Sequence, residues 1–150
     1  MAITIMAGPV MATPGSSGQR STTALIDVGA RGFSEDGEFV YVKAAEAIAV
    51  SGSTVSLSGG LAAVKIGDLD TGAFIGIAEA PFASGEYGYI RVKGPTLVIV
   101  ESGAVAGDSL QLSGTATKLK KTTTSGDQVA IALAASDNAS SAQISVYIGT

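Results

Sequence analysis

Two carboxylates in the stretch "GDLDTG" are the residues of this chain best suited to hold a divalent cation. Asp68 and Asp70 stand two positions apart in a glycine-bounded segment, and carboxylate oxygens are the hard ligands that Ca²⁺ and Mg²⁺ prefer. The ligand pattern of a full EF-hand loop is lacking. We therefore interpret the two acids as solvated turn residues and predict no metal site.

The residue types that the chain lacks exclude most catalytic chemistry. Histidine, cysteine and tryptophan are absent from the 150 residues. Without histidine, the commonest general base and transition-metal ligand is missing, and neither a Ser-His-Asp nor a Cys-His arrangement can form. Without cysteine, disulfides and thiolate zinc sites are excluded. We predict a protein that is not an enzyme, with no catalytic residues and no cofactor.

A row of aromatic and cationic residues runs along the stretch "GEYGYIRVKG". Tyr87, Tyr89, Arg91 and Lys93 alternate with smaller or apolar residues, so an extended strand places all four on one face. Such a row suits nucleic acid or a sugar, an ordinary solvated face, or a protein interface. Because the next segment, "TLVIV", is apolar enough to lie inside a sheet, we expect the row on the outer face. We favour a protein contact over a solvated face, and either over nucleic acid.

The charge balance argues against nucleic acid and for assembly. The formal net charge is −4, and the basic cluster "KLKK" at 118–121 is interpreted as keeping a strand edge soluble. Charged residues make up 15% of the chain, against about 25% in a typical soluble domain. No apolar run is long enough for a membrane helix. The deficit favours a surface covered by neighbouring subunits, with a compact domain that is sparing with charge as the alternative.

The remaining pattern is β throughout. From Glu38 onward, runs rich in Val, Ile and Tyr recur at roughly 8- to 12-residue spacing between turn residues. This spacing predicts an all-β domain over 33–150, a small antiparallel β-barrel or sandwich. Residues 1–32 contain "GPVMATPGSSGQRSTT" and predict an extended N-terminal arm. Its β-prone ends, "AITIM" and "ALIDV", suit pairing with another chain, and a floppy terminus is the alternative.

The β domain contains an internal repeat. The stretches "AVSGSTVSLSG" at 49–59 and "AVAGDSLQLSG" at 104–114 match at an offset of 55 residues. The last strands, "YIRVK" and "SVYIG", need a one-residue gap to bring their apolar faces into phase. If the repeat is real, the core consists of two similar β units. In "AGDSLQL" we expect a positive φ at Gly107, a bond from Asp108 to the backbone, and Leu110 and Leu112 in the core.

The segment from residue 74 onward resembles the head decoration (cement) proteins of tailed bacteriophages. The matching motifs are a strand with "G-x-A", the hairpin "ASGEYGYIRVKG", the turn "AGD-x-L", the segment "AIALAA" and a closing β strand. The resemblance covers about half of the chain, and residues 1–73 match it less clearly.

The resemblance implies a structural protein on the outer surface of the virion head. Such a protein binds the major capsid protein lattice and stabilises it against internal DNA pressure. The implied partners are the major capsid protein and further copies of this chain, commonly in a trimer, with no nucleic acid and no membrane. We assign the capsid or subunit interface to the arm and the row, namely Ile3, Ile5, Met6, Val10, Met11, Tyr87, Tyr89, Arg91 and Lys93.

A β-sandwich module that binds carbohydrate or a cell surface, as in a fibre or adhesin, is the alternative function. It would use Tyr41, Tyr87 and Tyr89 as a stacking platform, although aromatic residues make up only 5% of the chain. A carboxylate enzyme around Asp68 and Asp70 has the least support.

Overall fold

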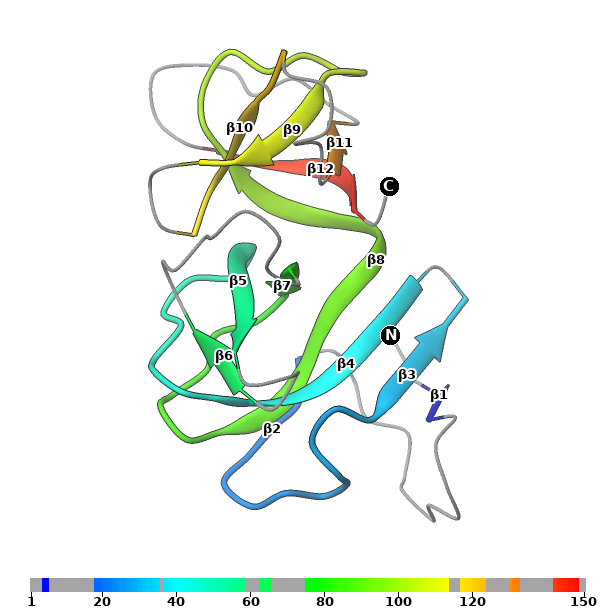
Figure 1. Cartoon of the computed structure of the whole chain (residues 1–150), viewed down its shortest axis with the longest axis vertical. Coiled ribbons are helices and arrows are strands. Elements are labelled where there is room, and N and C mark those ends of the chain that lie inside the picture. Colours follow the sequence, from blue (N-terminus) through cyan, green and yellow to red (C-terminus); the bar gives the residue numbers. More distant parts are fainter. Residues whose placement is uncertain are drawn as a thin grey trace.

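The computed structural model is an all-β protein, which confirms the predicted fold class. The structure describes residues 4–5, 18–35, 37–58, 63–65, 75–113, 117–123, 130–132 and 142–148. These residues form twelve strands, and no helix occurs among them. The long strand β8 (Tyr87–Val100) runs through the molecule and carries one group of strands along each of its halves (Figure 1).

The first group of strands is linked by a ring of pairings, and we call it the first unit. It consists of β4 (Gly37–Ala44), β5 (Ser53–Ser58), β6 (Ala63–Lys65), β7 (Ile75–Ala78) and the first half of β8. β4 pairs with β6, β6 with β5, β5 with β7, β7 with β8, and β8 with β4.

The second group, which we call the second unit, repeats this order. It consists of the second half of β8, β9 (Ser109–Leu112), β10 (Leu119–Lys121), β11 (Ala130–Ala132) and β12 (Ala142–Ile148). β8 pairs with β10, β10 with β9, β9 with β11, β11 with β12, and β12 with β8. Each strand of the first unit therefore has one counterpart, and the two-unit interpretation of the repeat is confirmed.

The registers of the two units agree as well. Tyr41 lies opposite Tyr89 in the first unit, and Leu97 lies opposite Ser145 in the second, each residue 56 positions after its counterpart. β5 and β6 correspond to β9 and β10 at the shorter offset of 55. The one-residue gap expected between the last strands of the two repeats is thus confirmed. The first strands, β4 and the second half of β8, align only with the same gap.

Neither ring is a continuously hydrogen-bonded barrel. One link in each ring is a single residue pair, Ile77 opposite Arg91 between β7 and β8, and Leu119 opposite Val100 between β10 and β8. The sheet is therefore not closed into a barrel. The pairs β4–β6 and β8–β10 are parallel, whereas the other pairs within the units are antiparallel, as predicted.

β8 bends where it passes from one unit to the other (Figure 1). Gly94 lies at this passage with a φ of 106°. A side chain at such a φ would strain the backbone, so glycine permits the strand to change direction between the two sheets.

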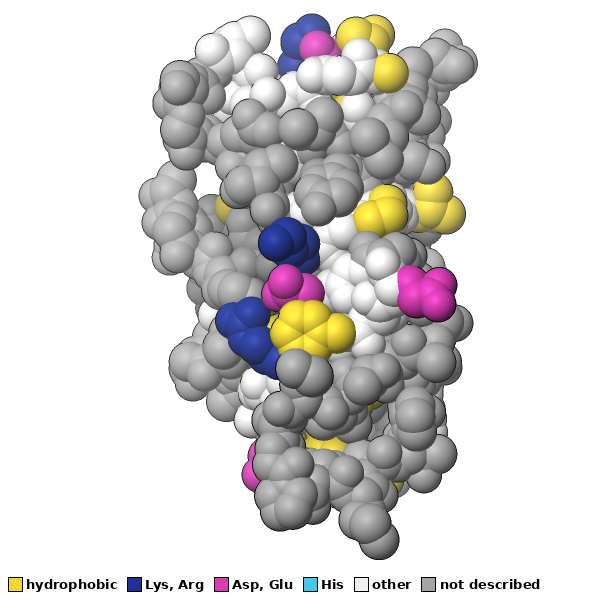
Figure 2. Space-filling model, turned by 90° about the vertical axis from the view of Figure 1, so that its right-hand side faces the viewer, with side chains coloured by type: hydrophobic (Ala, Val, Ile, Leu, Met, Phe, Trp, Pro, Cys, Tyr) yellow, Lys and Arg dark blue, Asp and Glu magenta, His cyan; other side chains and the backbone are white. Residues whose placement is uncertain are grey.

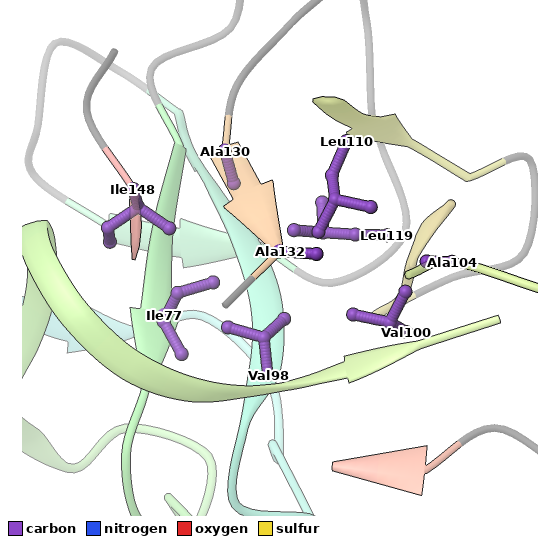
Figure 3. Packing of buried hydrophobic residues seen from close by; sticks show 9 residues of the cluster. All are labelled: Ile77, Val98, Val100, Ala104, Leu110, Leu119, Ala130, Ala132 and Ile148. Carbon is purple, nitrogen blue, oxygen red and sulfur yellow. The ribbon is translucent and has the colours of Figure 1, made fainter. Parts of the chain in front are cut away.

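Two apolar clusters fill the units, and β7 lies between them. The first cluster contains Val40, Val42 and Ile90 and is flanked by Val92, as expected for the inward side of β8. The cluster of the second unit also contains a residue of the first unit, Ile77, which lies near Val98 and Ile148 (Figure 3). The two cores therefore share a boundary at β7, and the core of the second unit is completed by a residue of the first unit.

The N-terminal strands lie on the first unit. They are β1 (Thr4–Ile5), β2 (Arg20–Ser21) and β3 (Arg31–Ser34). β2 pairs with β8, β3 with β4, and β1 with β3. Ile26, between β2 and β3, is buried with aromatic residues of β4 and β8. The described part of the predicted arm is therefore packed against the domain, and the predicted boundary between residues 32 and 33 falls inside β3.

Candidate interaction surface

The predicted row of aromatic and cationic residues lies along one face of β8, but the middle of the row is covered. Tyr89 and Arg91 are only 5% and 1% exposed, Tyr87 is half-buried, and Lys93 is exposed. The prediction of an outer face is wrong for Tyr89 and Arg91. Residues 18–34 fold back over Tyr89 on this side of β4 and β8, whereas Arg91 is enclosed by its contacts with Glu79 and the Phe39 ring. Of the row, Tyr87 and Lys93 remain accessible to another molecule.

The tyrosines that the carbohydrate alternative requires do come together, although they contact one another instead of solvent. The ring centroids of Tyr41 and Tyr87 are 6.3 Å apart, and those of Tyr41 and Tyr89 are 5.1 Å apart with the rings edge to face. Burial, together with Tyr41, raises the pKa of Tyr89 to about 12. Because Tyr41 and Tyr89 are buried under Ile26, the cluster is a small core and not an open stacking platform.

Arg20 fastens residues 18–34, which we call the covering segment, to the hairpin that precedes β8. Its Nε donates a hydrogen bond to the Pro81 carbonyl oxygen at 3.0 Å, and its Nη2 donates to that of Ala80 at 2.8 Å. Its guanidinium carbon lies 3.6 Å from the centroid of the Phe82 ring. Burial lowers the pKa of Arg20 to about 10, and nearby glutamates oppose this effect. The side chain therefore stays a cation at neutral pH and acts as a clamp.

Arg91 forms a buried ion pair at the junction of the two units. Its Nε donates to Glu79 Oε1 at 2.5 Å, and Thr96 Oγ1 donates to the same oxygen at 2.8 Å. The Arg91 guanidinium also lies 4.5 Å from the centroid of the Phe39 ring. Arg91 and Thr96 stand on the two halves of β8, whereas Glu79 follows β7. The pair is thus a structural element that holds the junction, and Arg91 does not face a partner.

A second group of charges lies at the surface beside this junction. Glu38 contacts Arg31 Nη1 at 3.7 Å and Lys93 Nζ at 3.8 Å, with all three side chains at least 30% exposed. Figure 2 shows basic and acidic side chains next to one another on this side of the molecule. Ion pairs that are this long and exposed contribute little to stability. Their charges therefore remain available to other partners.

Two equivalent turns each present an exposed valine. Val50 and Val105 are 52% and 53% exposed, and they stand 55 residues apart, at the same place in the repeat. Each valine is followed two residues later by a glycine with positive φ, Gly52 at 79° and Gly107 at 91°. The same apolar side chain is therefore offered to solvent by the same turn in both units.

Side chains that bond back to the backbone brace both turns. Val105 N donates to Asp108 Oδ2 at 2.9 Å, and Lys121 Nζ lies 2.9 Å from the same oxygen. The bond from Val105 and the bond from Lys121 lower the pKa of Asp108. In the first unit, Ser53 Oγ donates to the Val50 carbonyl oxygen at 2.6 Å. The predicted chemistry of the "AGDSLQL" turn is confirmed, with Leu110 buried and Leu112 packed against the core.

Several predicted residues lie where the structure makes no statement about their side chains. Asp68, Asp70 and the arm residues Ile3, Met6, Val10 and Met11 are outside the described residues, and Ile5 is placed only as part of β1. Across the described ranges, no group of three or more acidic residues is arranged to hold a metal ion. The same ranges contain no helix of the length and hydropathy needed to cross a membrane.

Sequence reasoning missed the valine pair and the Arg20 clamp. The repeat contained the signal for the valines, because an apolar residue next to a turn glycine recurs in both copies. No comparable signal pointed to Arg20, since its partners Ala80 and Pro81 are 60 and 61 residues away.

No protein-family model and no curated protein matches the sequence of this chain.

Proposed function

We propose that this chain is a structural decoration protein of a tailed-phage head. It would bind the outer surface of the head and stabilise the major capsid protein lattice against internal DNA pressure. It would carry out no catalysis and need no cofactor, and its partners would be the major capsid protein and other copies of this chain. The motifs of residues 74–148 support this proposal through their resemblance to that family.

The observation that carries the proposal is the pair of exposed valines. Val50 and Val105 are apolar, accessible and held by braced turns at equivalent positions of two units. A chain that repeats its own contact residue is suited to a partner surface that also repeats, such as a lattice of identical subunits. Two weak contacts on one chain reinforce each other, because the second forms at high effective concentration once the first has formed.

The low charge of the chain agrees with such a role. Charged residues make up 15% of the sequence, and neither exposed valine has a charged residue within two positions in the sequence. An apolar contact surface of this kind loses less hydration free energy when it is covered than a charged surface does. Tyr87 and Lys93, which remain accessible, would add contacts of their own, whereas Tyr89 and Arg91 are buried and would act only within the fold.

The first test is whether the chain is a virion component. Particles from the native source are banded on a density gradient, and the chain is quantified by mass spectrometry against the major capsid protein. We expect a high, fixed copy number per capsid protein. Absence from clean particles would refute the proposed function.

The second test asks which residues attach the chain. Shells that lack this protein are incubated with purified chain and sedimented. We expect Val50→Ser and Val105→Ser each to weaken binding, and the double variant to abolish it at concentrations that saturate the wild type. Leu25→Ser is the matched control, because Leu25 is another exposed apolar residue, at 59%, and lies between β2 and β3. Equal binding by the double variant and the wild type would show that the valines are not the contact.

The role of the arm needs a shorter deletion than 1–32. Removing residues 18–32 would take away Arg20 and Ile26 and uncover the tyrosine cluster. Deletion of residues 1–17 preserves these contacts. We expect the truncated chain to fold and to bind shells more weakly, and unchanged binding would remove Ile3, Ile5, Met6, Val10 and Met11 from the interface.

A further inference from the structure

The turn that carries Val50 is bonded to the second unit as well as to its own. The carbonyl oxygen of Gly52 accepts a hydrogen bond from Ile99 N at 3.0 Å, and Ile99 lies in the second half of β8. Thr54 N donates to the Thr117 carbonyl oxygen at 3.0 Å, and Thr117 precedes β10 of the second unit. The Val50 turn is therefore fixed on the second unit by two main-chain bonds.

The surroundings of the second bond make it costly to break. Thr54 is fully buried, so its N–H would lose its partner in a place without water if Thr117 moved away. Thr117 has a φ of 69°, which strains a β-branched residue, and such strain persists only where the surrounding structure holds the residue in place. Ile77 lies opposite Thr54 in β7 and belongs to the core of the second unit. Backbone bonds and a shared core thus act together at this junction.

The Val105 turn is bonded to the same second unit. Gly107 N donates to the Ala132 carbonyl oxygen at 2.8 Å, and Ala132 N donates to that of Asp108 at 2.9 Å. The Asp108 carboxylate also accepts the bond from Val105 N and contacts Lys121. The two exposed valines are therefore held by one and the same unit.

We propose that the two valine turns form one rigid two-site contact, which selects a partner surface whose apolar sites stand at one fixed spacing. This inference rests on the proposed function, which takes the two valines as the contact. If the turns moved independently, they could adapt to several spacings, but their motion would be lost on binding. A rigid pair keeps a high effective concentration for the second contact only where the spacing matches. Ile99 and Thr117 are then positioning residues that set the specificity without touching the partner.

The first test measures the distance between the two turns in the free full chain. Because the chain has no cysteine, the exposed Ala49 and Ala106, each next to one of the valines, can be replaced with cysteine and labelled with nitroxides. Double electron–electron resonance should give one narrow distance distribution. A broad distribution would overturn the proposal.

The Ile99→Pro variant tests the bond itself. It removes the N–H that reaches Gly52 and should broaden the distance distribution. Proline suits the β8–β12 pairing here, because Pro95, four residues earlier, stands at the same alternation of the ladder opposite Tyr147. Thr54→Val is the matched control, since it removes a buried hydroxyl that has no hydrogen-bond partner in the described part of the chain and keeps the main-chain bond. A folded Ile99→Pro chain with an unchanged distribution would overturn the proposal.

Amide hydrogen exchange of the wild-type chain tests the same bond without any substitution. The Ile99 amide should exchange much more slowly than that of Leu97, which lies two residues earlier and therefore on the same side of β8. Among the described residues, the bond to Gly52 is made by Ile99 and not by Leu97. Equal exchange rates for the two amides would show that the bond does not hold the turn in solution.

The last test measures binding to shells that lack this protein, by sedimentation. Ile99→Pro should weaken the binding of the chain with both valines at least about fivefold, because the second contact loses its fixed placement. It should leave the binding of the Val105→Ser chain unchanged, since a single contact has no spacing to keep. Equal weakening of both chains would overturn the proposal. The distance and exchange measurements need no shells, so their failure would leave the proposed attachment to a capsid standing. A chain with a narrow distance distribution that binds no shells would instead refute the proposed function.

Discussion

Replacing Glu79 with glutamine tests whether the buried ion pair holds the junction of the two units. The Arg91 side chain is 1% exposed, and its Nε lies 2.5 Å from Glu79 Oε1, which is itself in a side chain that is only 17% exposed. Thr96 Oγ1 donates to the same oxygen. Glutamine preserves the shape of the side chain but removes the carboxylate charge that pairs with the guanidinium in this contact.

The expected loss of unfolding free energy is about 3 kcal/mol. Removing one member of a buried pair costs roughly 3–5 kcal/mol, because the remaining charge loses an opposite charge away from water. The lower end applies here, since Arg91 still lies over the Phe39 ring and glutamine can still accept a hydrogen bond. A loss of this size lowers the folding equilibrium constant roughly a hundredfold.

Urea unfolding followed by circular dichroism, with linear extrapolation to water, measures this loss. Glu38→Gln is the control, because its ion pairs are longer and exposed, and we expect a loss of about 0.5 kcal/mol or less. Adding Arg91→Met to Glu79→Gln should recover part of the stability, since the buried charge is then gone. The reasoning is refuted if Glu79→Gln costs less than about 1 kcal/mol or no more than the control.

Three further predictions concern the shared core, the tyrosine cluster and the second turn. Ile77→Ala should cost about 3 kcal/mol, because the side chain is fully buried against the second unit, and urea unfolding should stay a single transition; a loss below about 1 kcal/mol would contradict the shared boundary. Burial raises the pKa of Tyr89 to about 12, above its unfolded value of about 10. The contribution of Tyr89 to the free energy of unfolding should therefore be complete below pH 10 and fall by about 1–2 kcal/mol as the pH rises toward 12. In urea titrations, the Tyr89→Phe variant should not show this part of the pH dependence. Because the pKa of Asp108 is lowered in the folded protein, its carboxylate stabilises the fold at neutral pH, and this stabilisation is lost as the pH falls through that pKa. Asp108→Ala should therefore lower the urea midpoint at pH 7 but not at pH 2. An equal effect at both pH values would show that the charge of Asp108 does not stabilise the fold.

The strands and turns of this fold could be predicted because they depend on residues close in sequence. Gly107 adopts the positive φ that its turn requires, Asp108 accepts a bond from Val105 three positions away, and Leu110 alternates into the core. The repeat predicted the second unit for the same reason, since similar local sequences form similar strands and turns.

The candidate surface was predictable only in part. Alternation along β8 showed which residues share a face, and the row from Tyr87 to Lys93 does share one. It could not show that residues 18–34 lie across that face, because this contact is made by Arg20 with the carbonyl of Pro81, 61 residues away. The exposure of Leu97, at 53%, was missed for the converse reason, because an apolar strand is expected to be buried on both faces unless its neighbours are known.

The sequence by itself determined the all-β class, the two-unit repeat and the absence of histidine and cysteine chemistry. These depend on residue types and on the two-residue period of a strand, both of which are local. The tertiary structure alone decided that Tyr89 and Arg91 are buried and that Leu97 is exposed. Burial depends on what packs on a face: a segment distant in the sequence covers Tyr89, and the ion pair with Glu79 and the Phe39 ring enclose Arg91.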